Sequence, residues 1–439
     1  MTHDFTSGGI LKPMVRFTIP LILANYLQLT YNAVDSIIVG RFLGEGALAA
    51  VGTTNPLMTL LIMFLRGTSL GAGVLIGSLF GARKYDLLKK QISTAMIAGC
   101  AFALLLSVFI AGFARQILIL IQVDPEILDM AASYLKIIAF GLIFTFGYNY
   151  LSSTMQALGD GRTPLLFLAI SASVNIAGDL LFVVKMGMGV HGAAAATVLA
   201  EAMSCFLCLF YIHRHVPLLD MGREWFSFDI TLLAKTLKYG VVSAVQQATV
   251  QLGIIGVQGV VNSLGMNVTA AFSAANRIDD FALIPGRSIA NAMTSAIAQN
   301  WGAGNRKRIR STFACGILID ALYGFFSGIL LWLFAENFMG LFTSSADVIR
   351  EGMVYLTLIA PMYALPSCTN CVQGYFRGTG DLKITLVSSI VNMGLRFGTS
   401  LYLILVRRMG IAAIPWSCLA GWLGMLAFEL PFMVRRSNK

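Results

Sequence analysis

Four polar side chains share one face of an apolar stretch near the start of the chain, within residues 16–39. They are Asn25, Gln28, Asn32 and Asp35, whose spacings of 3, 4 and 3 residues place them on a single face of a helix. An ionisable side chain in a membrane span costs at least about 2.5–3.5 kcal/mol at the bilayer centre, so its presence indicates a function. Because burial disfavours the charged form of a carboxylate, Asp35 is suited to bind a proton or a hard cation with oxygen ligands.

A second polar stripe occurs within residues 163–184, where Asn175 and Asp179 lie one helical turn apart. Thr197 follows one or two turns into the next apolar stretch. We expect these three side chains and Asp35 to converge on one oxygen-rich, cation-binding pocket. A second carboxylate there makes a double negative charge still less favourable, which promotes uptake of a proton or a cation. The alternative interpretation is a hydrogen-bonded network that only packs helices together.

Other polar residues within the apolar stretches are candidates for binding a substrate. This predicted substrate-binding set comprises Gln28, Asn32, Gln247, Gln251, Asp280 and Arg287. For Asp280 and Arg287, a purely structural ion pair is the alternative.

Two cysteine pairs have metal-ligand spacing, Cys205 with Cys208 and Cys368 with Cys371. Apolar spans rich in small residues readily contain such pairs, and the second pair has no matching pair nearby. The sequence also lacks a Ser/His/Asp set, a phosphate-binding loop and an HExxH helix. We therefore expect no enzyme activity, no metal site and no cofactor other than a coupling ion, H⁺ or Na⁺.

The composition indicates a membrane protein: 57% of the residues are hydrophobic and 12% are charged, whereas a soluble domain is about 25% charged. A bilayer core requires about 20 apolar residues of helix. Reading the sequence for such stretches predicts twelve transmembrane helices, at 16–39, 48–80, 88–113, 127–157, 163–184, 190–212, 237–263, 269–301, 308–334, 346–376, 381–406 and 410–434.

Lysine and arginine residues predict the orientation of these spans, because they are retained on the cytoplasmic side in short loops. Twenty of them fall in alternate loops and at the two ends of the chain, against six in the remaining loops. We therefore expect a multi-pass protein of the inner, cytoplasmic membrane with both termini in the cytoplasm. The same bias accounts for most of the net charge of +10 without a nucleic-acid partner.

The chain contains an internal repeat. A shift of 221 residues aligns 43–55 with 264–276 with five identities in thirteen positions, and the same offset continues along the chain. Chance recurrence of small residues is the alternative. Since each half has six spans, duplication places the halves around an axis along the membrane normal. We therefore predict an all-α fold of two pseudo-symmetric six-helix lobes, 1–218 and 219–439, around a central cleft.

The two halves differ at the polar positions. Asp35 corresponds to Gly256, and either Asn175 or Asp179 corresponds to Arg396, depending on the register of the repeat. In the second half, the permanently charged side chain of an arginine therefore replaces one member of the predicted cation-binding set. We infer that ion coupling belongs to the first half and that the second half contributes more to holding substrate.

Pro20 lies about four turns before Asp35 in the same predicted helix. Proline removes a hydrogen bond from the helix, which makes this position a predicted hinge. Protonation of Asp35 is then expected to change the bend of its own helix.

The chain resembles the multidrug and toxic compound extrusion family over nearly its whole length. The motifs that carry the resemblance are IPLIL (19–23), YNAVDSIIVGRFLG (31–44), ALAAVG (47–52), SLFGARK (78–84), QALGDGRTPL (156–165), VNIAGD (174–179), GAAAATVLAE (192–201), ANRIDDFALIPG (275–286), QNWGAGN (299–305) and FRGTGD (376–381). The resemblance implies alternating access by two lobes and export of small organic, often cationic compounds against inward H⁺ or Na⁺.

Family members with a cation site in the first lobe use the residue types found here at Asp35, Asn175, Asp179 and Thr197. The expected partners are small organic substrates and membrane lipids, and we expect a monomer. Alternatives are a lipid-linked oligosaccharide flippase of the same superfamily, which requires a strongly basic cleft, or a channel.

Overall fold

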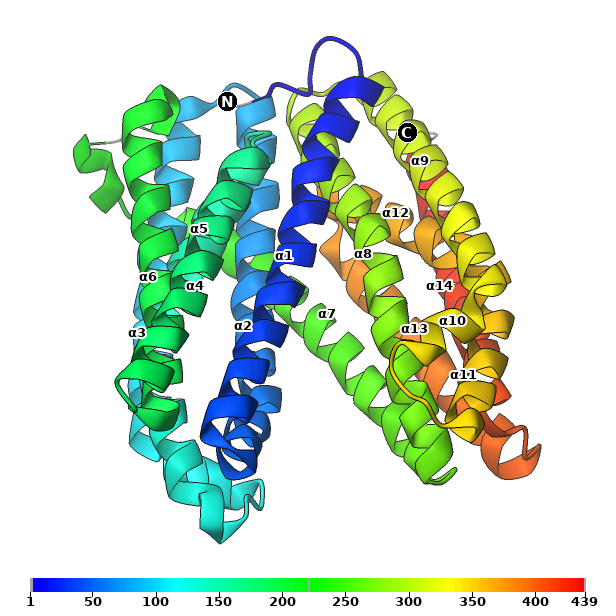
Figure 1. Cartoon of the computed structure of the whole chain (residues 1–439). Helices are drawn as coiled ribbons and strands as arrows, with labels where there is room; N and C mark the ends of the chain where they lie inside the picture. Colours follow the sequence, from blue (N-terminus) through cyan, green and yellow to red (C-terminus); the bar gives the residue numbers. More distant parts are fainter. Residues whose placement is uncertain (1–2, 220–221, 438–439) are drawn as a thin grey trace. The chain divides into compact units, whose positions relative to one another are not determined.

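The structure, a computed structural model, describes residues 3–219 and 222–437, and these residues form helices and no strand (Figure 1). The predicted all-α fold is therefore confirmed. Lys439, one of the predicted cytoplasmic basic residues, lies outside the described residues, as do the side chains of Arg223 and Arg436.

Six long helices occupy the first half of the described chain, and each coincides with one predicted span. They are α1 (Leu11–Leu43), α2 (Glu45–Gly81), α3 (Tyr85–Leu120), α4 (Pro125–Ala157), α5 (Arg162–Asp179) and α6 (Gly189–His215). A π-helical turn, Leu180–Lys185, extends α5 to the end of its predicted span. Two short 3-10 segments, Pro217–Leu219 and Gly222–Phe226, precede the second half.

The second half contains the remaining predicted spans and one short helix that was not predicted, α10. The helices are α7 (Ile230–Asn262), α8 (Met266–Gly302), α9 (Arg306–Leu333), α10 (Ala335–Gly340), α11 (Ala346–Ile359), α12 (Ala364–Gly378), α13 (Leu382–Leu401) and α14 (Ala413–Ser437). The predicted span 346–376 is divided into α11 and α12, which meet at a bend of 54°. Pro361 lies in the 3-10 turn at this bend, where its missing N–H interrupts the helical hydrogen bonds.

The two halves repeat the same backbone conformations at the offset of 221 residues found in the sequence. Gly159 and Gly380 have φ angles of 84° and 81°, and Gly44 and Gly265 have φ angles of 84° and 96°. Such positive φ angles favour glycine, which has no Cβ. The π-helical turns that follow α5 and α13 recur at nearly the same offset. The repeat therefore extends to the geometry of the turns.

Polar residues distinguish two of the long helices from the others. Within the described ranges, nine helices are long and apolar enough to cross a membrane, and the bent α11–α12 pair makes a tenth. The helices α1 and α8 have 33 and 37 residues, ample for a span, but they are less apolar. Five of the predicted binding residues lie in these two helices: Gln28, Asn32 and Asp35 in α1, and Asp280 and Arg287 in α8.

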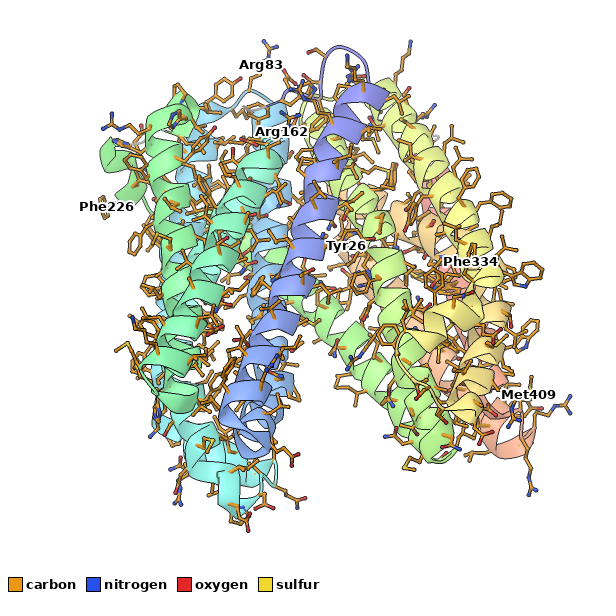
Figure 2. All side chains as sticks on the ribbon, viewed as in Figure 1. Tyr26, Arg83, Arg162, Phe226, Phe334 and Met409 are labelled. Carbon is orange, nitrogen blue, oxygen red and sulfur yellow. The ribbon has the colours of Figure 1, made fainter. Side chains whose placement is uncertain are left out.

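The described chain divides into two compact units, each with its own apolar core. Unit 1 comprises the residues up to Ser7, Val15–Ala244 and Gly302–Gly304, and unit 2 comprises Gly8–Met14, Val245–Trp301 and the residues from Asn305 onward. The predicted lobe boundary at 218/219 stays a prediction. Within unit 1, Arg83 and Arg162 lie at the same end (Figure 2), as the predicted orientation requires of two cytoplasmic residues.

Small residues let the helices of unit 1 approach one another closely. A Cβ atom added at Gly178 in α5 would lie 2.9 Å from the Cβ of Ala196 in α6. A Cβ atom at Gly147 in α4 would lie 2.6 Å from the Sγ of Cys205 in α6. Such contacts between small residues are typical of helices that pack within a membrane. They hold α4, α5 and α6 at a distance where short polar side chains can meet.

Replacing Gly178 by Leu should force α5 away from α6 and lower the melting temperature of the protein in detergent. Overpacking of this kind costs typically about 1–3 kcal/mol. Gly112 in α3 is the matched control, because nothing lies within 4 Å of a Cβ added there. Equal melting temperatures for Gly178→Leu and Gly112→Leu would show that the close approach of α5 and α6 does not contribute to stability.

Candidate cation site

Two aspartates face each other inside unit 1. Asp35 lies in the second half of α1, and Asp179 is the last residue of α5 and is fully buried. Their carboxyl groups lie within hydrogen-bonding range of each other. Two ionised carboxylates cannot hydrogen-bond, because both are acceptors only. The contact therefore requires a proton or another positive ion between them.

The protein itself supplies few donors to this pair. In the part of the chain that the structure describes, neither carboxyl oxygen of Asp179 has a hydrogen-bond donor, and the Oδ1 atom of Asp35 has none either. Buried polar atoms in proteins are nearly always satisfied, so three such atoms at one place need an explanation. A bound cation or proton would satisfy them.

Asn175 and Thr197 complete the predicted set. The Nδ2 atom of Asn175 donates to the Oγ1 atom of Thr197 over 3.4 Å, and that hydroxyl donates to the carbonyl oxygen of Ala193 over 3.1 Å. Asn175 is 3% exposed, and its Oδ1 atom has no donor in the described structure. Asp179 follows Asn175 by one turn of α5. The structure thus brings the four predicted cation-binding residues together, with oxygen atoms available as ligands for a hard cation.

Gln28 contacts an arginine of α2 that is not among the predicted site residues. The Nη2 atom of Arg66 in α2 donates to the Oε1 atom of Gln28 over 2.7 Å. The Nε atom of Arg66 donates to the Oδ1 atom of Asn149 in α4 over 3.3 Å. Asn32, one turn further along α1, is exposed. Gln28 is therefore held by the protein, whereas Asn32 is accessible.

The predicted substrate-binding residues of unit 2 lie in α7 and α8. Gln247 and Gln251 are half-buried in α7. The Oδ1 atom of Asp280 lies 3.4 Å from the Nη2 atom of Arg287, and the two side chains are 62% and 55% exposed. The two residues therefore form the ion pair that was the alternative to a role in substrate binding. Neither side chain of the pair is buried in the apolar core of unit 2.

Unit 2 contains a buried carboxylate that sequence reasoning missed. Asp279 precedes the selected Asp280 and is 8% exposed. Its Oδ2 atom accepts a hydrogen bond from the hydroxyl of Tyr355 over 2.7 Å, and its Oδ1 atom accepts one from Tyr363. Arg396 interacts with it electrostatically. Unlike the pair in unit 1, this carboxylate has protein donors on both oxygens and a fixed cation near it.

Glu201 is the carboxylate that sequence reasoning missed in unit 1. It lies in α6, one turn after Thr197, and accepts a hydrogen bond from the Oγ1 atom of Thr145 in α4. An acidic residue within a predicted span was the signal that selected Asp35, and the same signal applied to Glu201.

A further prediction concerns Pro20. Pro20 is buried inside α1, which runs as one helix from Leu11 to Leu43. Its role as a hinge stays a prediction.

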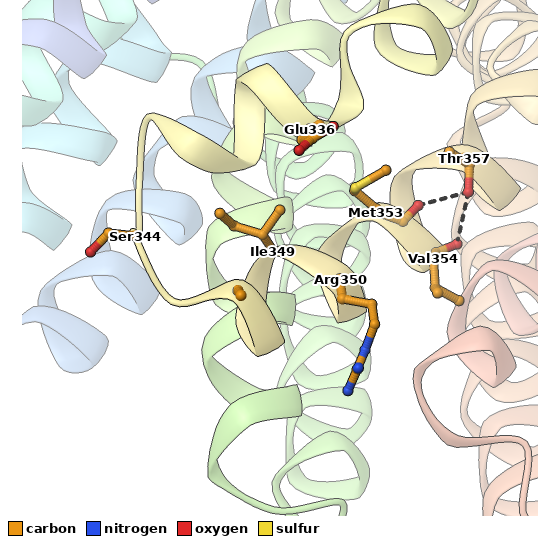
Figure 3. A pocket seen from close by; sticks show the side chains of 8 residues that line it. Glu336, Ser344, Ile349, Arg350, Met353, Val354 and Thr357 are labelled. Atoms are coloured by element: carbon orange, nitrogen blue, oxygen red, sulfur yellow. Dashed lines mark hydrogen bonds between the residues drawn. The ribbon is translucent and has the colours of Figure 1, made fainter.

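A surface hollow in unit 2 lies between α10 and α11 (Figure 3) and is lined by Glu336, Ser344, Ala346, Ile349, Arg350, Met353, Val354 and Thr357. None of the predicted site residues lines it.

Twelve predicted spans, an internal repeat and a candidate cluster of acidic and amide side chains within the spans indicate a polytopic membrane transporter. The MatE family model matches residues 20–181 and 243–401, so the chain belongs to the MatE family of multidrug and toxic compound extrusion transporters. The resemblance found in the sequence is thus confirmed.

Individual relatives agree with this assignment. The chain is 28% identical over 403 residues to the probable multidrug resistance protein YpnP of Bacillus subtilis, with 89% of this chain and 87% of the relative covered. It is 20% identical over 422 residues to the multidrug export protein MepA of Staphylococcus aureus, with 95% and 92% covered.

A solved structure described as the outward-facing conformation of a multidrug resistance MATE family transporter of the MOP superfamily has the same fold. Its TM-score is 0.93 at 21% identity, with 100% of this chain and 99% of that chain covered.

Replacing Asp179 by Asn should make the protein less sensitive to alkaline pH. The amide supplies a donor to Asp35 and removes one of two facing charges, so we expect the variant to melt at least about 1 °C above the wild type in alkaline buffer, equivalent to about 1 kcal/mol for a chain of this length. In acidic buffer, where a proton joins the wild-type pair, the two proteins should melt alike.

The matched control is Asp129→Asn, which removes an exposed carboxylate that lies 3.1 Å from Arg115. This control should follow the wild type at every pH. If Asp179→Asn also follows the wild type in alkaline buffer, the two carboxylates do not repel each other in the folded protein.

Proposed function

We propose that this protein is a cation-coupled antiporter that exports small organic, chiefly cationic compounds by alternating access. The observation that carries the proposal is the contact between the carboxyl groups of Asp35 and Asp179, three of whose oxygens have no donor in the described structure. Such a pair is stable when a positive ion lies in it and unstable when the ion leaves. Because the stability of the pair depends on the bound ion, an ion gradient can drive a change between two states of the protein.

The family and its relatives support the outward direction of transport and the small organic compounds as substrates. The relatives described above are named for multidrug resistance and multidrug export. Inward movement of H⁺ or Na⁺ through the aspartate pair would supply the free energy, and binding of the ion would alter the bend of α1 at Pro20. The distribution of basic residues supports a protein of the inner membrane with both termini in the cytoplasm.

A lipid-linked oligosaccharide flippase is the weaker candidate. A pyrophosphate headgroup needs basic side chains that are not already neutralised. In this chain Arg287 is paired with Asp280, and the guanidinium of Arg66 is bonded to Gln28 and Asn149. The solved structure of a Pyrococcus furiosus transporter of the MOP superfamily, described as having a binding pocket of reverse polarity, has a TM-score of 0.92 to this chain at 21% identity. The shared fold therefore does not select the cargo.

The Asp35→Asn variant tests the proposal. Everted membrane vesicles loaded with ethidium, a fluorescent organic cation, would be driven separately by a pH step and by a Na⁺ step. We expect one or both steps to drive ethidium movement in the wild type, and Asp35→Asn to abolish it while the protein remains folded. Asp129→Asn, the same chemical change at an exposed position, should transport normally. Undiminished coupled transport by Asp35→Asn would refute the assignment of the site.

A further inference from the structure

Glu201 is a carboxylate of unit 1 that the proposed exchange at the aspartate pair does not use. It lies within the candidate span formed by α6, where a charge is costly, and it is partly buried. Its Oε2 atom accepts a hydrogen bond from the hydroxyl of Thr145, and a Cβ atom added at Gly141 would lie 3.5 Å from the same oxygen. The glycine therefore lets α4 approach the carboxylate closely.

Charged and titratable groups face Glu201 from four helices. Those that interact with it electrostatically are Tyr31 of α1, Arg66 of α2, Tyr134 of α4 and Cys205 of α6. Arg66 is the cation among them, and its guanidinium donates to Gln28 and Asn149. Throughout the described ranges, no basic side chain lies within ion-pair distance of Glu201. Its negative charge is therefore only partly compensated.

Polar residues lie near Glu201 in two directions. Towards α5, Thr197 precedes it by one turn and accepts a hydrogen bond from Asn175, the neighbour of Asp179. Glu201, Thr197 and Asn175 thus form a stripe that leads to the aspartate pair.

In the other direction, the contacts lead back to α1. Thr145 donates to Glu201, and the Nδ2 atom of Asn149 donates to the carbonyl oxygen of Thr145 over 2.7 Å. Arg66 then joins Asn149 to Gln28, which lies two turns before Asp35. These contacts join residues of α1, α2, α4 and α6, and they connect Glu201 to Gln28.

From this arrangement we infer that Glu201 is a second proton-binding residue of unit 1, which takes up one proton per transport cycle in addition to the ion bound by Asp35 and Asp179. The carboxylate has one hydroxyl donor, no ion pair in the described structure and partial exposure through which a proton can enter. This inference rests on the proposed antiport, because a proton taken up at Glu201 must be released on the other side of the membrane.

The number of protons exchanged per substrate distinguishes this role from a structural one. At zero membrane potential, each proton exchanged allows a substrate gradient of about tenfold per pH unit at equilibrium. The slope is the change in the equilibrium substrate gradient per pH unit. A residue that only packs α4 against α6 changes the rate of transport and leaves this slope unchanged. A residue that carries a proton changes the slope by one power of ten.

The experiment measures the equilibrium distribution of ethidium in proteoliposomes at several imposed pH differences, with the membrane potential held at zero by potassium and valinomycin. The Glu201→Gln variant should lower the ethidium gradient by about tenfold per pH unit relative to the wild type. This expectation is the same whether the aspartate pair takes up H⁺ or Na⁺. Glu201→Asp, which keeps the carboxyl group, should restore the wild-type slope, and Glu126→Gln, a change at an exposed carboxylate of α4, should leave it unchanged.

Equal slopes for Glu201→Gln and the wild type would overturn the inference and leave the antiport proposal intact. If Glu201→Gln does not fold, the wild type still tests the inference, which requires an ethidium gradient of about a hundredfold per pH unit with H⁺ at the aspartate pair and about tenfold with Na⁺ at the pair. A pH-independent wild-type distribution would overturn the inference, because a proton-carrying Glu201 requires a pH-driven gradient. Failure of both a pH step and a Na⁺ step to drive the wild type would instead refute the proposed antiport.

Discussion

The contact between Asp35 and Asp179 constrains the rest of unit 1. Two carboxyl groups at close range inside a membrane protein are tolerable only with a positive ion between them, since each is an acceptor without a donor. The neighbouring helices are arranged accordingly. Gly178 and Ala196 bring α5 against α6 so that Asn175 reaches Thr197. The small residues of this unit therefore serve the geometry of the ion site as well as packing.

The aspartate pair of unit 1 and Asp279 of unit 2 are buried acids with different surroundings. In unit 1 the aspartate pair lacks protein donors for three of its oxygens. In unit 2 Asp279 receives hydroxyl groups from Tyr355 and Tyr363 and has Arg396 nearby. A carboxylate that is already satisfied has little to gain from a cation. This difference gives a structural reason to expect ion coupling at the aspartate pair and not at Asp279.

Local sequence patterns were sufficient to predict the helices and the candidate cation-binding residues of the first half. Asp279 and Glu201 were missed because their surroundings depend on contacts with residues far away in the sequence. Apolar length identified the spans, and helical spacing placed Asn175 and Asp179 on one face. The choice between Asp279 and Asp280 depended on partners 76 and 84 residues away in the sequence, which no local pattern contains. Glu201 is an acidic residue within a predicted span, as Asp35 is, but the hydroxyl of Thr145 that donates to it lies in another helix. The bend between α11 and α12 followed from proline, whereas the π-helical turns had no evident sequence signal.

The most direct test of the ion pair is a high-resolution crystal structure determined at acidic pH and again at alkaline pH in the presence of rubidium, whose anomalous scattering locates a bound monovalent cation. Our account predicts that the carboxyl groups of Asp35 and Asp179 remain in contact at acidic pH. At alkaline pH they should either hold the cation or move apart. Two carboxylates that stay in place at both pH values, each bonded to donors of the protein with no ion between them, would contradict the account.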